Sequence, residues 1–172
     1  FSGMRDVDRF LALARENGLY VVARPGPYIC SEWDGGALPA WLGLKLRQEQ
    51  LRQYDSAYLK EVEKWFDKIL PILERRQLGR EGSVILLQLE NELDIYQCRE
   101  PKLYLEALVK MTEKFQIQIP RVVCTSSQLD MDYSGATAEK VYPAFNIYSA
   151  PEYPALEERL QIIWSKLKGT EW

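Results

Sequence analysis

Two glutamates, Glu90 and Glu92, stand two positions apart just after an apolar run of the sequence. Their side chains would point to the same face if that run were a strand that continued regularly, whereas a break in the strand would separate them. A carboxyl group crowded by a second carboxylate has a raised pKa and holds its proton at neutral pH, as a general acid must. Asn91, between them, offers a donor and an acceptor that suit sugar hydroxyl groups.

A second polar stretch, residues 24–33, follows another apolar run at 19–23. If both runs are parallel strands, their carboxyl ends meet on one face, where acidic side chains are costly to bury without a partner or a function. A glutamate at the end of a strand can equally cap a helix or form a salt bridge. Trp33 and Trp41 can be platforms for a sugar ring or ordinary anchors of a loop.

The spacing of apolar residues predicts helices and strands in alternation. A helix that ends at Gly18 precedes the first strand, and Pro71 is expected to kink or finish the second helix. Short runs that are apolar on both faces indicate buried strands of a parallel sheet. The expected helices are 4–17, 56–73, 101–115 and 154–168, the expected strands are 19–23, 84–88, 121–124 and 144–148, and a short helical connection is expected at 133–140.

Two parallel architectures fit this alternation. A doubly wound sheet usually carries a glycine-rich phosphate loop after its first strand, and the sequence has none there. The alternative is a (β/α)8 barrel, whose active site lies where the strands end. A complete barrel takes roughly 250 residues, so four strands in 172 residues would be about half of one. We therefore expect an α/β fold that is a partial TIM barrel.

The composition restricts the chemistry. The 172 residues are 47% hydrophobic and 27% charged, with a net charge of −3, which predicts one soluble unit that binds neither nucleic acid nor a membrane. A cytoplasmic location is slightly favoured over secretion, and nothing fixes an oligomeric state. The chain has no histidine, which excludes a Ser-His-Asp triad or a histidine-ligated metal within it, so acid/base chemistry must come from other side chains. Cys30, Cys98 and Cys124 are too widely spaced for a disulfide framework or a CxxC metal site.

Several strings of residues together resemble one known family. The stretch 24–33 is long and highly specific, whereas 88–92 is shared more loosely with other barrel glycosidases. The remaining matches are Phe1-Ser2-Gly3, Asp6, Phe10-Leu11 and Pro39-Ala40-Trp41-Leu42. On these residues the chain resembles the family 35 glycoside hydrolases, the β-galactosidase family, over about its first 95 positions.

The resemblance implies hydrolysis of terminal non-reducing β-D-galactosyl residues, with a β-galactoside or related oligosaccharide as the substrate and no cofactor or metal. It makes 19–23 the third strand and 84–88 the fourth strand of the barrel. The chain would then hold roughly strands three to six with their helices. Residues 1–172 would be the central part of a single catalytic barrel, cut at both ends.

The mechanism implied by the resemblance is retaining: one glutamate attacks the anomeric carbon, and another protonates the leaving oxygen and later activates water. Glu92 matches the acid/base, and Asn91 matches the residue that binds the sugar 2-hydroxyl. Glu171 is a weak candidate for the nucleophile, because no strand precedes it, so we expect the nucleophile to lie beyond residue 172. Further expected substrate contacts are Cys30, Ser31, Glu32 and Tyr148.

The sequence departs from the family pattern at Gly35-Gly36-Ala37, where an aromatic residue or methionine and then two glycines are usual, and at Leu93-Asp94, where Tyr-Gly is usual. These departures keep the acid/base and put the sugar in question. One alternative is an exo-β-glucosaminidase or other β-glycosidase with the same mechanism, since Asp94 would attract an amino sugar unless it only caps a helix. Another is a non-catalytic carbohydrate-binding module, since no nucleophile is found.

Overall fold

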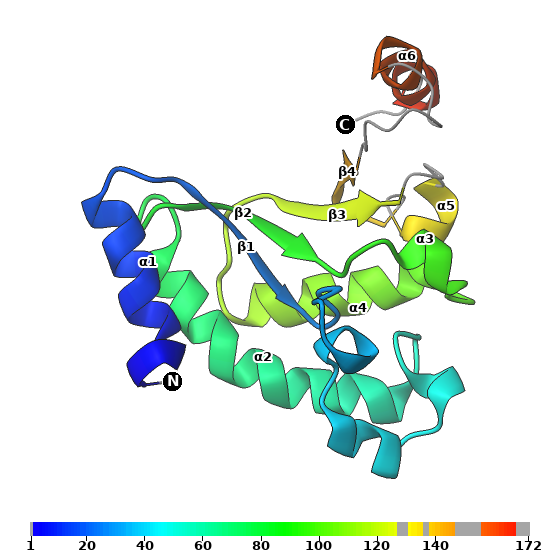
Figure 1. Ribbon diagram of the computed structural model, residues 1–172, viewed down its shortest axis with the longest axis horizontal. Coiled ribbons are helices and arrows are strands. Elements are labelled where there is room, and N and C mark those ends of the chain that lie inside the picture. The colour runs from blue at the N-terminus through cyan, green and yellow to red at the C-terminus, as the bar shows by residue number, and fades with distance from the viewer. Residues whose placement is uncertain (1, 127–130, 136–137, 147–155, 168–172) are drawn as a thin grey trace.

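The structure, a computed structural model, describes residues 2–126, 131–135, 138–146 and 156–167 (Figure 1). In this part of the chain four parallel strands form one sheet in the order β1-β2-β3-β4, so each strand pairs with its neighbours in the sequence. The α/β class and the parallel sheet expected from the sequence are confirmed. The strands are β1 (Val21–Gly26), β2 (Val84–Leu89), β3 (Arg121–Thr125) and β4 (Tyr142–Phe145).

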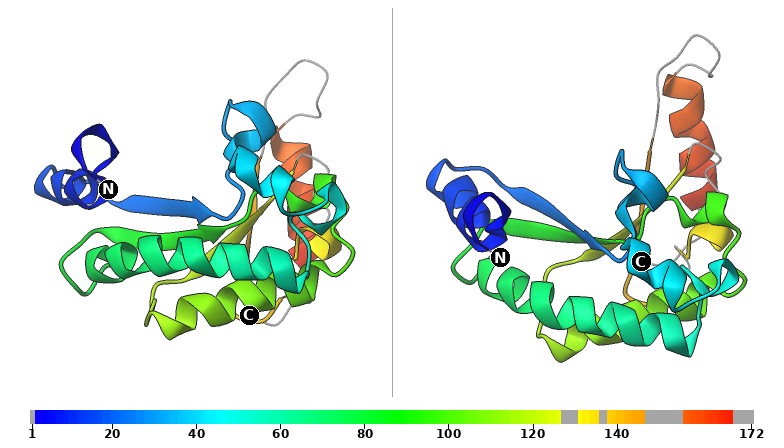
Figure 2. Two further views of the ribbon diagram at one scale, coloured as in Figure 1. Left: turned by 90° about the horizontal axis from the view of Figure 1, so that it is seen from below. Right: turned by 60° about the horizontal axis from the view of Figure 1, so that its bottom comes forward.

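Two long helices, α2 and α4, lie side by side across one face of the sheet (Figure 2). The α-helices are α1 (Val7–Glu16), α2 (Ser56–Arg76), α3 (Leu93–Tyr96), α4 (Pro101–Lys114), α5 (Met131–Ser134) and α6 (Leu156–Leu167), and the 3-10 helices are η1 (Gly3–Arg5), η2 (Asp34–Ala37), η3 (Ala40–Leu44) and η4 (Gln48–Gln50). Apolar side chains recur along α2 at helical spacing and are buried in the core, which also contains Leu87 of β2 and Leu108 of α4.

Local polar groups set where the helices begin and end. The Asp55 carboxylate accepts the backbone N–H groups of Ala57 at 2.9 Å and Tyr58 at 3.0 Å, and so caps the start of α2. Pro101 occupies the first turn of α4, as expected, where a helix has no use for the missing N–H. Gly18 lies just beyond α1 with a φ of +71°, a left-handed conformation that favours glycine.

Pro71 was expected to kink the second helix or to end it. The helix does not end there, because α2 continues to Arg76. Ile72 and Leu73, directly after the proline, are buried in the core, and this burial offsets the backbone hydrogen bond that proline removes. The last residue is also anchored from outside the helix. Arg76 donates from Nε and Nη2 to the two carboxylate oxygens of Asp8 in α1, at 2.8 and 2.9 Å.

The first strand lies further along the chain than expected. β1 begins at Val21 instead of position 19. It extends beyond the expected end at position 23, because Gly26 pairs with Leu89 after an irregularity in the register. Trp65 of α2 donates from Nε1 to the Pro25 carbonyl at 2.8 Å, so the proline end of the strand is held to the helix below it.

The last part of the sheet also differs from the expected boundaries. β4 is Tyr142–Phe145 rather than 144–148, since Tyr142 already pairs with Val122 of β3. The helical connection expected at 133–140 is the single turn α5 instead. Positions 147 and 148 lie outside the described residues. No helix within the described ranges is long and apolar enough to cross a membrane.

Candidate active site

The residues after β2 form a tight turn at the carboxyl end of the sheet. Glu90 and Glu92 both have a left-handed backbone, with φ of +58° and +47°. The Glu90 N–H donates to the Gly26 carbonyl at 3.1 Å and the Glu92 N–H donates to the Cys124 carbonyl at 3.0 Å, so the turn is tied to β1 on one side and to β3 on the other. The strand does not continue regularly beyond Leu89, and the two carboxylates bind different partners instead of sharing a face.

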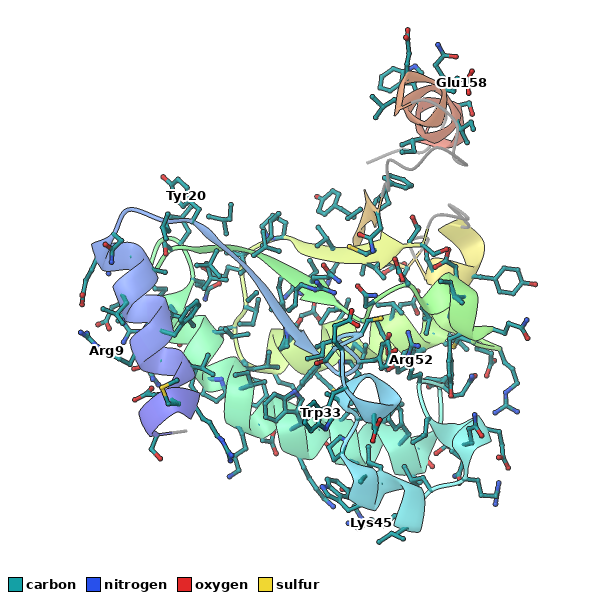
Figure 3. All side chains as sticks on the ribbon, in the orientation of Figure 1. Arg9, Tyr20, Trp33, Lys45, Arg52 and Glu158 are labelled. Carbon is teal, nitrogen blue, oxygen red and sulfur yellow. The ribbon has the colours of Figure 1, made fainter. Side chains whose placement is uncertain are left out.

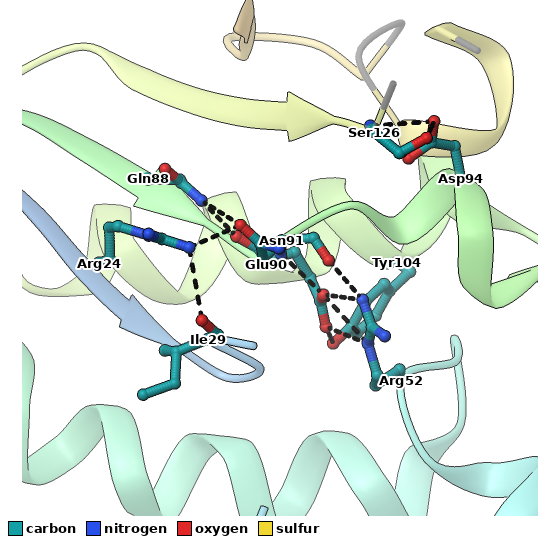
Figure 4. A network of polar contacts seen from close by, with 9 residues as sticks. All are labelled: Arg24, Ile29, Arg52, Gln88, Glu90, Asn91, Asp94, Tyr104 and Ser126. Atoms are coloured by element: carbon teal, nitrogen blue, oxygen red, sulfur yellow. Dashed lines mark hydrogen bonds and ion pairs between the residues drawn. The ribbon is translucent and has the colours of Figure 1, made fainter. Parts of the chain in front are cut away.

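Glu90 is buried and bound to Arg52 (Figure 4). Arg52 Nη2 donates to Oε2 of Glu90 at 2.7 Å, and Nε lies 3.2 and 3.3 Å from the two carboxylate oxygens. The Tyr104 hydroxyl donates to Oε1 at 2.9 Å, and the Asn91 N–H donates to Oε2 at 3.0 Å. Arg52 thus compensates the charge of this carboxylate, and each of its two oxygens has hydrogen-bond donors.

The buried position of Tyr104 keeps its hydroxyl in the donor state. Burial, together with the neighbouring Glu90 carboxylate, raises the Tyr104 pKa well above its ordinary value. The phenol therefore retains its proton throughout the neutral range and remains a hydrogen-bond donor to Glu90.

Arg52 is a site residue that the sequence analysis missed. It lies inside the molecule in a loop before α2, and its guanidinium carbon is 3.7 Å from the ring centre of Tyr28 and 4.5 Å from that of Tyr96 (Figure 3). Burial opposes its charge, but the carboxylate of Glu90 outweighs burial and raises the Arg52 pKa above its usual range. No local pattern around residue 52 marks it, since an arginine in a loop is ordinarily solvated.

Asn91 is buried, and its amide is held in one orientation. Its Oδ1 accepts from Arg24 Nη2 at 2.6 Å and from Gln88 Nε2 at 3.2 Å (Figure 4). Arg24 is itself directed by the Ile29 carbonyl, at 3.4 Å from the same Nη2 atom. Since both donors bind the oxygen, the Nδ2 group is left as a donor that no described residue engages. Of the two hydrogen-bonding groups of the Asn91 amide, the Nδ2 donor therefore stays available to a ligand.

Glu92 is half-buried three positions after the end of β2, and its side chain reaches the residue that follows β4. Its Oε1 accepts a hydrogen bond from Asn146 Nδ2 at 2.6 Å. Asn146 directly follows β4, and its own N–H donates to the Thr125 carbonyl at the end of β3 at 3.3 Å. Asn146 is a second residue that the sequence analysis missed, because a single asparagine after a weak strand gives no signal. The Glu92 carboxylate is therefore held in place by the sheet itself.

Cys30, Ser31 and Glu32 are exposed in the loop that follows β1, at the same end of the sheet as Glu92. The loop folds on itself: the Ser31 N–H donates to the Gly36 carbonyl at 3.3 Å, and the Gly36 N–H donates to the Trp33 carbonyl at 2.8 Å. The structure thus brings the predicted binding stretch to the edge of the site without a direct bond to Glu92 among the described contacts. Tyr148 and Glu171 lie outside the described residues.

Asp94, proposed from the sequence as an attraction for an amino sugar, is engaged elsewhere. Its carboxylate is buried and accepts the Ser126 N–H at 2.9 and 3.1 Å and the Ser126 hydroxyl at 2.7 Å. Asp94 therefore joins α3 to the segment after β3 (Figure 4). A carboxylate enclosed in this way is not presented to a substrate, so the reason for favouring an amino sugar is lost.

Comparison with known proteins gives the same family that the motifs indicated. The family model described as glycosyl hydrolases family 35 matches residues 1–166. The chain belongs to this family. The match extends well beyond the first 95 or so positions over which the motifs are strong, and it includes β3 and β4.

Several β-galactosidases match over part of the chain. Beta-galactosidase of Mus musculus is 49% identical over 96 residues, which are 56% of this chain and 15% of that protein. Beta-galactosidase of Homo sapiens is 48% identical over 96 residues, or 56% of this chain and 14% of that protein. Beta-galactosidase 17 of Arabidopsis thaliana is 43% identical over 111 residues, or 64% of this chain and 16% of that protein. The matches therefore span only 14 to 16% of the length of these relatives.

Two tryptophans of the family 35 motif lie in different surroundings. Trp33 is 77% exposed beside Glu32 and Asp34, where it is open to contact from solvent (Figure 3). Trp41 lines a separate apolar cavity of about 510 Å³ with Pro25, Tyr58 and Trp65 among its walls. Trp33 and the 46% exposed Trp41 are both accessible, so each can still act as a platform for a sugar ring or as an anchor of its loop.

A metal centre among the residues that the structure describes would need a cluster of metal-ligating side chains. Within the described ranges, no group of three or more Cys, Asp and Glu side chains is arranged to hold a metal ion. The three cysteines are free thiols, with Cys30 exposed and Cys98 and Cys124 buried.

Proposed function

We propose that this family 35 chain is part of an enzyme that hydrolyses terminal non-reducing β-D-galactosyl residues with retention of configuration, and that Glu92 is its general acid/base. The position of Glu92 carries this proposal. It is a half-buried carboxylate at the carboxyl end of β2, held to β3 through its backbone and to Asn146 through its side chain. Active sites of parallel barrels lie at this end of the strands. The β-galactosidases that match the chain support galactose as the sugar.

We propose that the chain forms roughly strands three to six of a (β/α)8 barrel. Residues 1–172 would then be the central part of a single catalytic domain. A doubly wound sheet reverses its strand order at the ligand site. The described sheet runs from β1 to β4 without such a reversal, and α2 and α4 cover the same face (Figure 2). Strands from the rest of a longer polypeptide would close the barrel by pairing with β1 and β4, which form the edges of the described sheet.

The chemistry assigned to Glu92 has two steps. A nucleophilic carboxylate attacks the anomeric carbon while the Glu92 carboxyl group protonates the departing glycosidic oxygen, which leaves a glycosyl-enzyme and an ionised Glu92. Glu92 then takes a proton from water, whose oxygen displaces the nucleophile from the sugar. In retaining enzymes the two carboxyl groups lie about 5 Å apart. We place the nucleophile beyond residue 172, with Glu171 as the weaker alternative.

The neighbouring polar groups are assigned to the sugar. The Asn91 Nδ2 donor, oriented by the two bonds to Oδ1, is proposed to bind the 2-hydroxyl group. The exposed loop with Cys30, Ser31 and Glu32 is proposed to bind other hydroxyl groups, and Tyr148 is proposed as a further contact. No step in this scheme uses a cofactor.

The test uses the complete natural polypeptide that contains this chain, as wild type, Glu92→Gln and the control Glu139→Gln. Glu139 is an exposed glutamate outside the site, so the control makes the same chemical change elsewhere. Aryl β-galactoside, β-glucosaminide and β-glucoside are compared. We expect the galactoside to react fastest, and Glu92→Gln to lose about 100-fold or more in rate on poor leaving groups, where protonation matters most.

Other outcomes reject defined parts of the proposal. Full activity of Glu92→Gln would show that Glu92 is not the acid/base. A preference for the β-glucosaminide would replace galactose by an amino sugar. If galactose binds and no substrate is turned over, the chain belongs to a carbohydrate-binding module.

A further inference from the structure

Arg52 connects two parts of the proposed site without lying beside the reacting bond. The loop before α2 supplies this arginine, which is 5% exposed, and its partners come from three other segments. Tyr28 belongs to the loop after β1, Glu90 and Asn91 belong to the turn after β2, and Tyr96 belongs to α3. A single buried side chain therefore touches the segments that carry the proposed acid/base and the proposed sugar contacts.

The in-plane donors of Arg52 fix the turn that carries Glu92. Nη2 donates to Oε2 of Glu90 and to the backbone carbonyl of Asn91, each at 2.7 Å (Figure 4). The left-handed conformations of Glu90 and Glu92 are unfavourable for residues with side chains and persist only where surrounding contacts hold them. The Arg52 fork supplies those contacts at the first half of the turn, whereas the Cys124 carbonyl holds the second half.

Two aromatic rings lie against the guanidinium of Arg52. The Tyr28 and Tyr96 rings cover the guanidinium, with centres 3.7 and 4.5 Å from its carbon, so its donors stay directed at the turn. Tyr28 is itself held by Gly36, where an added Cβ would lie 2.3 Å from the tyrosine ring. The loop that contains Cys30, Ser31 and Glu32 is thus packed against the same arginine as the acid/base turn.

We propose that Arg52 is a positioning residue for the glycosidase reaction. It holds the 90–92 turn and the 27–36 loop in a fixed relative position, so that Glu92 meets the glycosidic oxygen of a sugar bound by the loop. The inference rests on the proposed function, because it assigns Arg52 an effect through Glu92. Lysine would retain the charge at this position but not the planar fork, since an ammonium group has no fixed pair of donors.

The experiment measures how strongly the reaction depends on protonation of the leaving group. It uses the complete natural polypeptide and two aryl β-galactosides, one with dinitrophenol and one with an unactivated phenol as the leaving group. The first needs little help from an acid, whereas the second depends on it. The quantity compared is the ratio of kcat/KM for the good leaving group to kcat/KM for the poor one. Loss of folded enzyme lowers both values equally and cancels in the ratio.

We expect Arg52→Lys to raise this ratio about 10-fold over wild type, because a displacement of the acid of about 1 Å is enough for such an effect. The matched control Arg47→Lys makes the same change at an exposed arginine directly before η4, and its ratio should equal that of wild type. An unchanged ratio in Arg52→Lys would overturn the proposal and leave the arginine a purely structural residue.

A second pair of variants tests the positioning role if Arg52→Lys does not fold. Tyr96→Leu removes one of the two stacked rings, and Tyr96→Phe keeps it. We expect the ratio to rise about 3-fold in Tyr96→Leu and to stay at the wild-type value in Tyr96→Phe. Equal ratios in both variants would overturn the proposal.

Failure of the proposed function gives a different result. If Glu92→Gln does not raise the ratio, the acid/base assignment is wrong and the role of Arg52 is rejected with it. If Glu92→Gln raises the ratio by about 100-fold while the Arg52 and Tyr96 variants leave it unchanged, only the positioning role is rejected.

Discussion

Asn146 donates a 2.6 Å hydrogen bond from Nδ2 to Oε1 of Glu92, although 54 positions separate the two residues in the sequence. The bond passes across β3, because β2 and β4 each pair with that strand. The backbone of Asn146 is set by the Thr125 carbonyl, so the donor is placed by the register of the sheet. The orientation of the proposed acid/base therefore depends on correct pairing of three strands.

Asn146→Ala should weaken catalysis by the complete polypeptide. Without the Nδ2 donor the Glu92 carboxyl group loses a fixed orientation toward the leaving oxygen, and we expect kcat/KM for an aryl β-galactoside with a poor leaving group to fall about 10-fold. Asn17→Ala, at an exposed asparagine after α1, provides the control. Steady-state kinetics that show equal kcat/KM values in the two variants would contradict a role for Asn146 in orienting Glu92.

Two adjacent glycines offer a matched test of the loop after β1. Gly35 and Gly36 share a left-handed backbone, with φ of +62° and +63°, but only at Gly36 would an added Cβ meet the Tyr28 ring, at 2.3 Å. Both alanine variants carry the same backbone strain, so the difference between them isolates the clash. We expect Gly36→Ala to have about 10-fold lower kcat/KM on an aryl β-galactoside than Gly35→Ala. Indistinguishable kinetics would mean that the Tyr28 contact does not support the site.

The fold follows from local patterns to a large extent. The apolar run at 84–88 and the stripe along 56–73 determine β2 and α2, because burial of a regular apolar face decides both elements. Pro71 shows where local reasoning fails. The propensity of proline to end a helix is outweighed by core burial of Ile72 and Leu73, and the sequence around the proline does not reveal that burial.

Less of the candidate site than of the fold could be predicted from the sequence. Asn91 and Glu92 were predicted because the string 88–92, directly after an apolar run, resembles the family pattern. Arg52 and Asn146 were missed because their roles depend on contacts with Glu90 and Glu92, which lie 38 and 54 positions away. Whether Glu90 and Glu92 share a face depended on the backbone beyond Leu89, and a left-handed turn of non-glycine residues has no signature in the sequence.

The ion pair between α1 and α2 predicts a pH dependence of stability. Hydrogen bonds from Arg76, followed by those from Arg75, lower the pKa of Asp8 below its ordinary value. A carboxyl group with a lowered pKa in the folded state stabilises it above the pKa of the unfolded state, and this contribution disappears as the pH falls through the folded-state pKa. We expect Asp8→Asn to reduce the free energy of unfolding by about 0.5–1 kcal/mol at pH 7, because the pair is partly exposed, and to have little effect near pH 2–3.

Urea denaturation of wild type, Asp8→Asn and the control Asp34→Asn at the two pH values measures this difference. Asp34 is exposed, so its substitution should change stability little at either pH. A loss in Asp8→Asn that is equally large at pH 7 and at low pH would assign the effect to packing instead of to the charge.

The cysteines differ in burial, and the reactivity that this predicts tests the proposed sugar contacts. Burial raises the pKa of Cys98 to about 11 and raises that of Cys124 as well, while Cys30 is exposed in the loop after β1. Because the thiolate is the reactive form, we expect iodoacetamide at pH 8 to alkylate Cys30 first, and Cys98 and Cys124 only after unfolding in urea. Peptide mapping by mass spectrometry follows each site in the complete polypeptide. Saturating galactose should slow alkylation of Cys30 if this residue contacts the sugar, whereas an unchanged rate would remove Cys30 from the proposed binding loop.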